Sequence, residues 1–210
     1  MTTIRSYHDR CPIARALDVV GERWALLVVR ELLLGPQRFS ELRRALPRAS
    51  TNMLTDRLRE LEAHGVVQRR VLPPPSASSV YQLTERGRAL EGVLDALGAW
   101  GASEAPPADG SLSAAAVLMF LRGSARAHPD PPAGVWGLLL DGQPWTIIGR
   151  NGELEIRPGE PLEAESELET DADTLNALLL DPTGLDRAVA DDKVRLHGEA
   201  TAPPWLLIAA

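Results

Sequence analysis

Two short helices joined by a tight turn are predicted in the first third of the chain. The second is predicted over residues 51–63, with Ser50 as its N-cap and Gly65 as its C′ glycine, and Pro47 ends the first. Both carry an apolar stripe at helical spacing, made of Phe39, Leu42, Leu46, Leu54, Leu58 and Leu61. This pattern is typical of a helix-turn-helix, in which the second helix enters the DNA major groove. Any small helical hairpin with a solvated face shows the same periodicity, so both interpretations stay open at this point.

A two-stranded wing is predicted directly after these helices. Residues 66–72 and 80–83 alternate as strands, and residues 73–79 form a turn rich in proline and serine between them. Thr84 then caps a helix predicted over about residues 85–100. These elements complete a winged helix-turn-helix domain.

A long helix is predicted before the helix-turn-helix, from Cys11-Pro12 to about Leu34, after a polar arm over residues 1–10. It is more apolar than one packed face requires. Together with the helix ending at Trp100, it predicts a homodimer interface built from terminal helices; a fully buried core helix is the alternative.

Ordered motifs across residues 11–101 carry a family resemblance. They are Cys11-Pro12, Gly21-Glu22-Arg23-Trp24, Leu32-Leu33, Gly35, Arg38-Phe39-Ser40-Glu41-Leu42, Met53-Leu54-Thr55, Arg57-Leu58-Arg59-Glu60-Leu61, Gly65-Val66-Val67, Tyr81, Leu83-Thr84, Gly87 and Trp100-Gly101. In these motifs the chain resembles the HxlR-type winged-helix transcriptional regulators. It departs from them at Glu22, where a second glycine is usual, and at Arg48-Ala49, which replaces a glycine and an apolar residue.

The resemblance implies a homodimer on double-stranded DNA with a palindromic operator, because a dimer axis places two recognition helices about one duplex turn apart. Residues on the recognition helix, its flanks and the wing are the candidates for DNA contact. They are Arg38, Ser40, Arg48, Ser50, Thr51, Asn52, Thr55, Arg57, Arg59, Arg69, Arg70, Ser78 and Ser79. For Arg59, pairing with Glu60 or Glu62 within the fold is the alternative.

The net charge of −7 is unevenly distributed along the chain. Residues 1–104 carry fifteen arginines against twelve acidic residues, whereas residues 105–210 carry seven basic against seventeen acidic residues. Since DNA affinity depends on local phosphate neutralisation, the positive first half fits a DNA-binding domain. The acidic second half is expected to point away from DNA.

A second domain is predicted over residues 111–210, after a linker rich in proline and alanine at residues 102–110. A helix at 112–126 precedes strands at 135–140, 145–148, 154–156 and 162–169, with hairpin turns at Asp141-Gly142 and Asn151-Gly152. Helices at 172–180 and 185–190, a strand at 194–196 and a last helix at 203–209 follow. The expected class is α+β, with one antiparallel sheet covered by helices.

This half resembles the sterol-carrier-protein-type lipid-binding domain in a looser set of motifs: Asp173, Leu175, Leu178-Leu179, Leu185, Ala188, Val194, Leu196 and Gly198-Glu199. The resemblance implies an apolar cavity between sheet and helices that binds a lipid-like small molecule. The candidate lining residues are Leu118, Trp136, Leu138, Leu140, Trp145, Ile147, Leu154 and Ile156. A solid core without ligand fits the same periodicity.

No catalytic, metal or cofactor motif stands out in the sequence. The four histidines are scattered, there is no phosphate-binding glycine loop, and the alternating glutamates at 163–169 are expected to be a solvated strand face. We therefore expect no enzyme activity, metal or cofactor. No apolar run approaches the roughly 18 residues of a membrane span, and no signal peptide is evident, so a cytoplasmic protein without membrane contact is expected.

Three functions are consistent with these observations. The first is a homodimeric transcriptional regulator, with repression expected, whose second domain senses an apolar small molecule. The second is a redox or electrophile sensor acting through Cys11, the single cysteine, whose thiolate is favoured by a helix start and by Arg10 and Arg15. The third is a lipid-binding protein whose winged helix does not bind DNA specifically.

Overall fold

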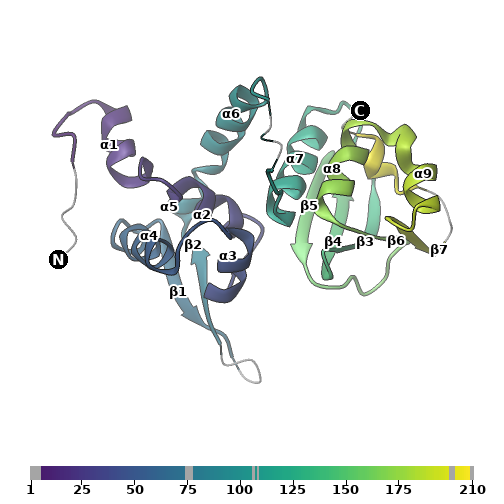
Figure 1. The fold of residues 1–210 in the computed structure, drawn as a ribbon, viewed down its shortest axis with the longest axis horizontal. Helices are drawn as coiled ribbons and strands as arrows, with labels where there is room; N and C mark the ends of the chain where they lie inside the picture. Colours follow the sequence, from purple (N-terminus) through teal and green to yellow (C-terminus); the bar gives the residue numbers. More distant parts are fainter. Residues whose placement is uncertain (1–5, 74–77, 106, 108, 199–201, 209–210) are drawn as a thin grey trace. The chain divides into compact units, whose positions relative to one another are not determined.

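The computed structural model describes residues 6–73, 78–105, 107, 109–198 and 202–208. Contacts divide the chain into two compact units, Met1–Ala105 and Pro106–Ala210. The boundary falls within residues 102–110. Each unit is described by itself, and the ribbon is shown in Figure 1.

Unit 1 begins with two helices, α1 (Pro12–Val20) and α2 (Ala25–Leu32), and not with the single helix expected to about Leu34. Helix α1 ends at its C-cap residue Gly21. Before α2 begins, Trp24 adopts a left-handed backbone conformation with φ 78°. That conformation is incompatible with a continuous right-handed helix. The prediction of one long helix was therefore wrong, because the apolar periodicity continues across the break.

The helix-turn-helix consists of α3 (Phe39–Ala45) and α4 (Thr51–Ala63), as predicted. The Ser50 hydroxyl accepts a hydrogen bond from the Met53 N–H at 3.3 Å, which caps α4. At the other end Gly65 has φ +66°, and the Val66 N–H donates to the Leu61 carbonyl at 2.9 Å. This is a Schellman C-cap, so local sequence signals set both ends of α4.

The wing is formed by β1 (Val67–Val71) and β2 (Ser79–Leu83), paired antiparallel. Gln37 joins the outer side of β2 through hydrogen bonds with Tyr81 in both directions, at 2.9 and 2.8 Å. The tip of the predicted turn, residues 74–77, lies outside the described residues. The strand pairing therefore ties the segment before α3 to the wing.

Two helices, α5 (Glu85–Arg88) and α6 (Glu91–Gly101), replace the single helix expected at 85–100. Thr84 caps α5 by accepting from the Gly87 N–H at 3.1 Å, and its own hydroxyl donates to the Gly65 carbonyl at 2.6 Å. A Cβ on Gly87 would collide with the Val66 carbonyl oxygen. The end of α4, the wing and α5 are thus packed backbone against backbone.

The core of unit 1 lies beneath the helix-turn-helix. Leu42, Leu54 and Leu58 are at most 1% exposed and pack with residues of α2 and the wing. Because α4 buries its leucine stripe here, its opposite face is directed to solvent.

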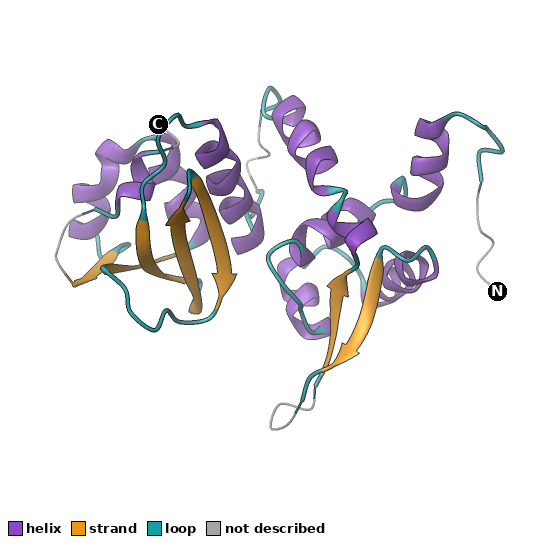
Figure 2. Cartoon of the chain, turned by 180° about the vertical axis from the view of Figure 1, so that it is seen from behind, coloured by secondary structure: helices purple, strands orange, loops and turns teal. Residues whose placement is uncertain are grey.

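Unit 2 is an α+β layer with a five-stranded sheet. Helix α7 (Ala114–Ala127) precedes strands β3 (Gly134–Leu140), β4 (Gln143–Arg150) and β5 (Glu153–Pro158). After these come β6 (Ser166–Thr170), α8 (Ala172–Leu180), the short 3-10 helix η1 (Pro182–Gly184), α9 (Leu185–Ala190) and β7 (Arg195–Gly198). A 3-10 helix η2 (Pro204–Leu207) lies where a last helix was expected. Figure 2 shows the helices gathered on one face of the sheet, with the other face open.

The two predicted hairpin turns are present. Asp141 and Gly142 have φ values of 51° and 72°, and Asn151 and Gly152 have 56° and 79°. Two successive positive φ angles are the geometry of a two-residue type I′ turn, which suits the right-handed twist of the strands.

The sheet order is β5-β4-β3-β6-β7, and β3 pairs with β6 in parallel. The prediction of a purely antiparallel sheet was therefore wrong. Residues 159–165 return the chain so that β6 enters beside β3 in the same direction, with the Glu165 N–H donating to the Val135 carbonyl at 2.9 Å. Alternation of apolar residues reports which face a side chain occupies and carries no information on strand direction. The strand expected from Leu162 begins only at Ser166, and Leu162 is fully exposed.

Candidate functional site

The start of α4 presents a row of exposed polar side chains. Thr51 and Asn52 are exposed, and the Thr55 hydroxyl donates to the Thr51 carbonyl at 2.8 Å. Ser50 is also exposed, although its oxygen caps the helix. Exposed amide and hydroxyl groups at the start of a helix have the chemistry required to contact base edges.

Arg43, on the last turn of α3, was not among the predicted site residues. Its Nε lies 3.4 Å from the Thr51 hydroxyl and its Nη1 lies 3.3 Å from the Pro47 carbonyl oxygen. Its guanidinium therefore bridges the turn of the helix-turn-helix and adds positive charge beside the start of α4. The sequence signal was a basic residue in the last turn of the first helix. Arg48, within the same turn, is exposed.

Arg57 and Arg59 lie two residues apart on α4 in opposite environments. The Arg57 side chain is 15% exposed; it donates to Glu60 Oε1 at 3.0 Å and lies 3.9 Å from Glu22. The Arg59 side chain is 74% exposed, with Asp56 at 3.9 Å. Arg57 is thus engaged within the fold, and the structure gives no support for its predicted contact with DNA. Arg59 remains on the surface and pairs with neither carboxylate that had been considered for it.

The wing holds two arginines through serine hydroxyls. Arg38 Nε donates to the Ser78 hydroxyl at 3.1 Å, and Arg69 Nε donates to the Ser79 hydroxyl at 2.5 Å. The Arg69 guanidinium also lies 6.0 Å from the centre of the aromatic ring of Tyr81, its cross-strand neighbour. These contacts orient both cations before any ligand arrives, which lowers the entropy that binding would cost.

Two further wing and turn positions are less constrained. Arg70 is exposed and lies on the opposite face of the wing from Arg69, because adjacent strand residues alternate. Ser40, in the first turn of α3, is also exposed.

Exposed apolar side chains gather on the two helices that were expected to form a dimer interface. On α1, Ile13 is 71% exposed and Leu17 is 43% exposed; on α6, Val93, Leu97 and Trp100 are 50%, 47% and 69% exposed. Large exposed apolar groups on each of these helices are suited to contact with a partner.

Cys11 is exposed and is the N-cap residue of α1. Its backbone N–H donates to the Asp9 carboxylate at 2.9 Å. The thiol is therefore accessible, while a carboxylate lies beside it that the sequence prediction had not considered.

All eight predicted lining residues of unit 2 are buried, with exposures between 0% and 6%, and face the layer between sheet and helices. The indole nitrogens of Trp145 and Trp205 are buried too, and neither has a hydrogen-bond partner within the described part of the unit. The interior is thus almost wholly apolar, and both indole nitrogens are donors without an acceptor in its described part.

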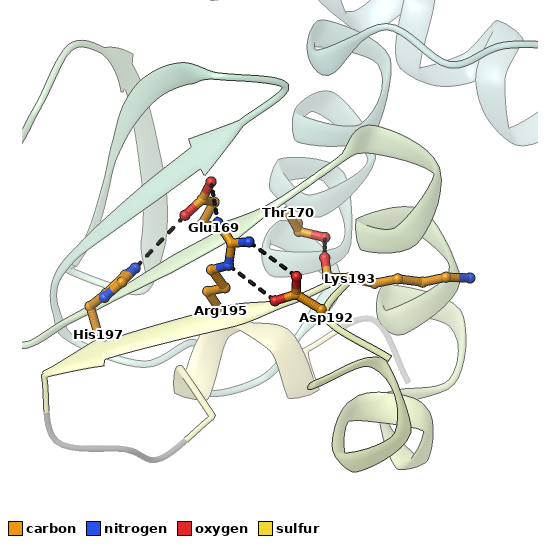
Figure 3. Close-up of polar contacts among 6 residues, drawn as sticks. All are labelled: Glu169, Thr170, Asp192, Lys193, Arg195 and His197. Carbon is orange, nitrogen blue, oxygen red and sulfur yellow. Dashed lines mark hydrogen bonds and ion pairs between the residues drawn. The ribbon is translucent and has the colours of Figure 1, made fainter. Parts of the chain in front are cut away.

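A charged cluster on the open face of the sheet is explained by ion pairing across the β6–β7 edge (Figure 3). Arg195 donates two hydrogen bonds of 3.1 Å to Asp192, and these bonds, followed by the charge of Arg195, lower the pKa of the Asp192 carboxyl. Glu169 lies 3.7 Å from Arg195 and 3.8 Å from His197. The backbone carbonyl of Lys193 accepts a hydrogen bond of 2.9 Å from the Thr170 hydroxyl. Each member is accounted for by a structural contact.

The described residues contain no group of three or more side chains suited to a metal ion. Among them, no helix is long and apolar enough to cross a bilayer.

Comparisons with known proteins concern the first unit. The family model for HxlR-like helix-turn-helix proteins matches residues 19–109. The regulators YvaP and YodB of Bacillus subtilis, both named HTH-type transcriptional regulators, are 43% and 39% identical over 93 and 100 residues. These alignments cover 44% and 47% of this chain, and 86% and 89% of the relatives. A solved structure titled "Redox regulator HypR in its oxidized form" is 39% identical, covers 46% of this chain and all of its own, and has a TM-score of 0.43. The chain belongs to the HxlR-like helix-turn-helix family of transcriptional regulators.

Proposed function

We propose that the protein is a homodimeric DNA-binding transcriptional repressor whose second unit senses an apolar small molecule. The observation that carries the DNA-binding part is the exposed polar start of α4, held over a buried leucine stripe and flanked by arginines. Membership of a family of transcriptional regulators supports it.

In this proposal Ser50, Thr51, Asn52 and Thr55 contact base edges in the major groove, and the arginines around them contact phosphates. The phosphate contacts come from Arg38, Arg43, Arg48, Arg59, Arg69 and Arg70, with Ser40, Ser78 and Ser79 as hydroxyl donors. Arg57 is left out because its ion pairs occupy it within the fold.

Dimerisation through α1 and α6 follows from their exposed apolar residues. A two-fold axis there would pair two α4 helices and give a palindromic operator with half-sites roughly 34–36 Å apart. Repression is the expected sign, since a dimer bound across an operator blocks access to the DNA beneath it.

The ligand-sensing part rests on the buried apolar interior of unit 2 and on the motifs that resemble a sterol-carrier-type domain. For a ligand to regulate DNA binding, it must have different affinities for the DNA-competent and DNA-incompetent states. A molecule that binds both states equally would occupy unit 2 without any regulatory effect.

Selection from a random duplex library tests the DNA-binding part with the full chain. Enrichment of a two-fold symmetric sequence supports the proposal. Binding that stays indifferent to sequence at both low and high salt would leave a ligand-binding protein whose winged helix does not recognise DNA.

Mass spectrometry of the purified protein tests the other two parts together. Under native conditions we expect a dimer carrying a co-purified apolar molecule that is released under denaturing conditions. A monomer would refute the α1–α6 interface. A dimer without any adduct withdraws this support for a ligand in unit 2.

The exposure of Cys11 favours a second candidate, a thiol-based sensor of oxidants or electrophiles. Cys11→Ser discriminates between the two. If the variant loses an oxidant response in operator binding, the thiol mechanism holds. If it keeps an unaltered response to the small molecule, the ligand mechanism holds.

A further inference from the structure

Two indole N–H groups in unit 2 are buried without an acceptor. Trp145 on β4 is 6% exposed and Trp205 on η2 is 0% exposed, and neither Nε1 has a partner among the described residues. An indole N–H can only donate, so nothing but an acceptor atom satisfies it. Buried donors without acceptors destabilise a folded protein and are rare, which makes two in one small interior informative.

Both indoles lie in the buried interior of unit 2. Trp145 and Ile147 lie on the same, buried face of β4, and β4 lies between β3 and β5 in the sheet. Trp205 sits on the short helix that packs against α8. Both donors therefore lie in the apolar interior of the unit that is proposed to receive the ligand.

The buried polar side chains of this unit offer little to satisfy these donors. Only Ser166 and Thr170 are buried among the described polar residues of the unit, and neither hydroxyl accepts a hydrogen bond from either indole. An acceptor atom of a bound ligand could therefore accept hydrogen bonds from these indole N–H groups. The low dielectric of the interior would strengthen such bonds.

We infer that the molecule bound by unit 2 is an apolar compound carrying at least one hydrogen-bond-accepting oxygen, and that the Nε1 groups of Trp145 and Trp205 donate to it. The inference rests on the proposed ligand-sensing function and specifies the chemical class of its ligand. A ketone, quinone, ester or carboxylate has the required acceptor, and a pure hydrocarbon lacks it. A site built to hydrogen-bond its ligand discriminates strongly against an analogue without the bonding group.

The test uses a matched pair of probes, 2-acetylnaphthalene and 2-ethylnaphthalene. They share the two-ring body and nearly the same size, and differ by a carbonyl group in place of a methylene. Binding to the full-length protein is measured by calorimetry. The indole N–H resonances of the ¹⁵N-labelled protein are followed in parallel, with assignments from Trp145→Phe and Trp205→Phe, which remove the donor and keep an aromatic ring.

We expect the ketone to bind about tenfold more tightly than the hydrocarbon, which corresponds to one net hydrogen bond. The Trp145 and Trp205 indole signals should move downfield with the ketone only. Either phenylalanine variant should reduce the ketone's advantage without weakening the hydrocarbon. The Trp100 signal serves as the internal control, because its side chain is 69% exposed on unit 1.

The possible failures are distinguishable from one another. Equal affinity for the two probes, with both buried indole signals unmoved, overturns the inference and leaves an interior that binds by packing alone. Absence of binding by either probe counts against ligand sensing itself, and the inference falls with it. If a variant does not fold, the indole signals of the unaltered protein still decide the question. A third probe, 2-naphthoate, shows whether the preferred acceptor is neutral or anionic.

Discussion

Two arginines on α4 give a sharp test of which side chains serve the fold and which serve DNA. We compare Arg57→Met with Arg59→Met. Methionine keeps most of the apolar stem and has a helix propensity close to that of arginine, so the two changes differ mainly in the charge they remove and its surroundings.

The expected loss of stability follows from the contacts. Arg57 is 15% exposed and donates to Glu60, whose side chain is 28% exposed, while Glu22 lies more distant at 3.9 Å. A hydrogen bond to a charged group contributes about 1.5–3 kcal/mol; discounting for the partial exposure of Glu60, we expect Arg57→Met to cost about 1–2 kcal/mol. Arg59 has only an exposed pair with Asp56, so Arg59→Met should change stability by less than about 0.5 kcal/mol.

The assay for stability is scanning calorimetry of the full chain. A loss of 1–2 kcal/mol in a unit of this size corresponds to a fall in melting temperature of roughly 5–10 °C. The transition of unit 1 is the one that should move, and that of unit 2 should stay in place as the internal control.

The assay for DNA binding is the salt dependence of operator affinity. Removing one phosphate contact reduces the slope of log K against log salt by about 0.9, and we expect that reduction for Arg59→Met only. A lowered slope for Arg57→Met with unchanged stability would refute the placement of Arg57 within the fold. A stability loss above about 1 kcal/mol for Arg59→Met would refute its placement on the surface.

Further predictions concern recognition, assembly and packing. Asn52→Ala should weaken specific binding by about 1–3 kcal/mol and leave non-specific binding unchanged, as measured by fluorescence anisotropy; equal affinity would remove Asn52 from the interface. Trp100→Glu should convert the dimer to a monomer at micromolar concentration in analytical ultracentrifugation, because it places a charge in an apolar interface. Gly87→Ala should cost about 1–3 kcal/mol in chemical denaturation, since its Cβ meets a backbone carbonyl that has no room to yield. Arg195→Met should raise the pKa of Asp192 in an NMR titration. Because the pKa of Asp192 is lower in the folded than in the unfolded protein, the ionised carboxylate stabilises the native state at pH values above the unfolded-state pKa. That stabilisation is lost as the pH falls through the folded-state pKa.

The parts of the fold that sequence predicted well are those where local signals and packing agree. For α4, a serine N-cap, a leucine stripe and a C′ glycine all indicate the same boundaries, and the structure has those boundaries. The two type I′ hairpin turns were also predicted from local sequence, because asparagine or aspartate followed by glycine tolerates the required positive φ angles.

The errors have one physical origin, which is that apolar periodicity records burial and not backbone continuity or direction. The break between α1 and α2 lies within an apolar run, where Trp24 packs against the core despite its left-handed backbone. The parallel pairing of β6 leaves no trace in the alternation of Leu168 with its glutamate neighbours. Long-range topology has to be observed.

The site was predictable to the level of a surface and not to the level of individual roles. Exposure of the α4 start follows from its leucine stripe. Arg57 pairs with Glu60, one turn along the same helix, and also lies 3.9 Å from Glu22, which is thirty-five positions away in the sequence. The unsatisfied indoles of Trp145 and Trp205 follow from packing across the whole of unit 2, for which no local signal exists.

Charge illustrates why the local surface, and not the chain, determines the partner. The whole protein has a net charge of −7, which taken alone argues against a polyanion such as DNA as its binding partner. Exposed charges separated by more than about 8–10 Å are largely screened at physiological salt, so a phosphate interacts chiefly with the side chains next to it. Around the start of α4 and the wing those side chains are arginines, and Arg38 and Arg69 are already oriented by serine hydroxyls. In the proposed function the acidic residues of unit 2 therefore contribute solubility and non-specific repulsion, while the arginines of unit 1 contribute the affinity for DNA.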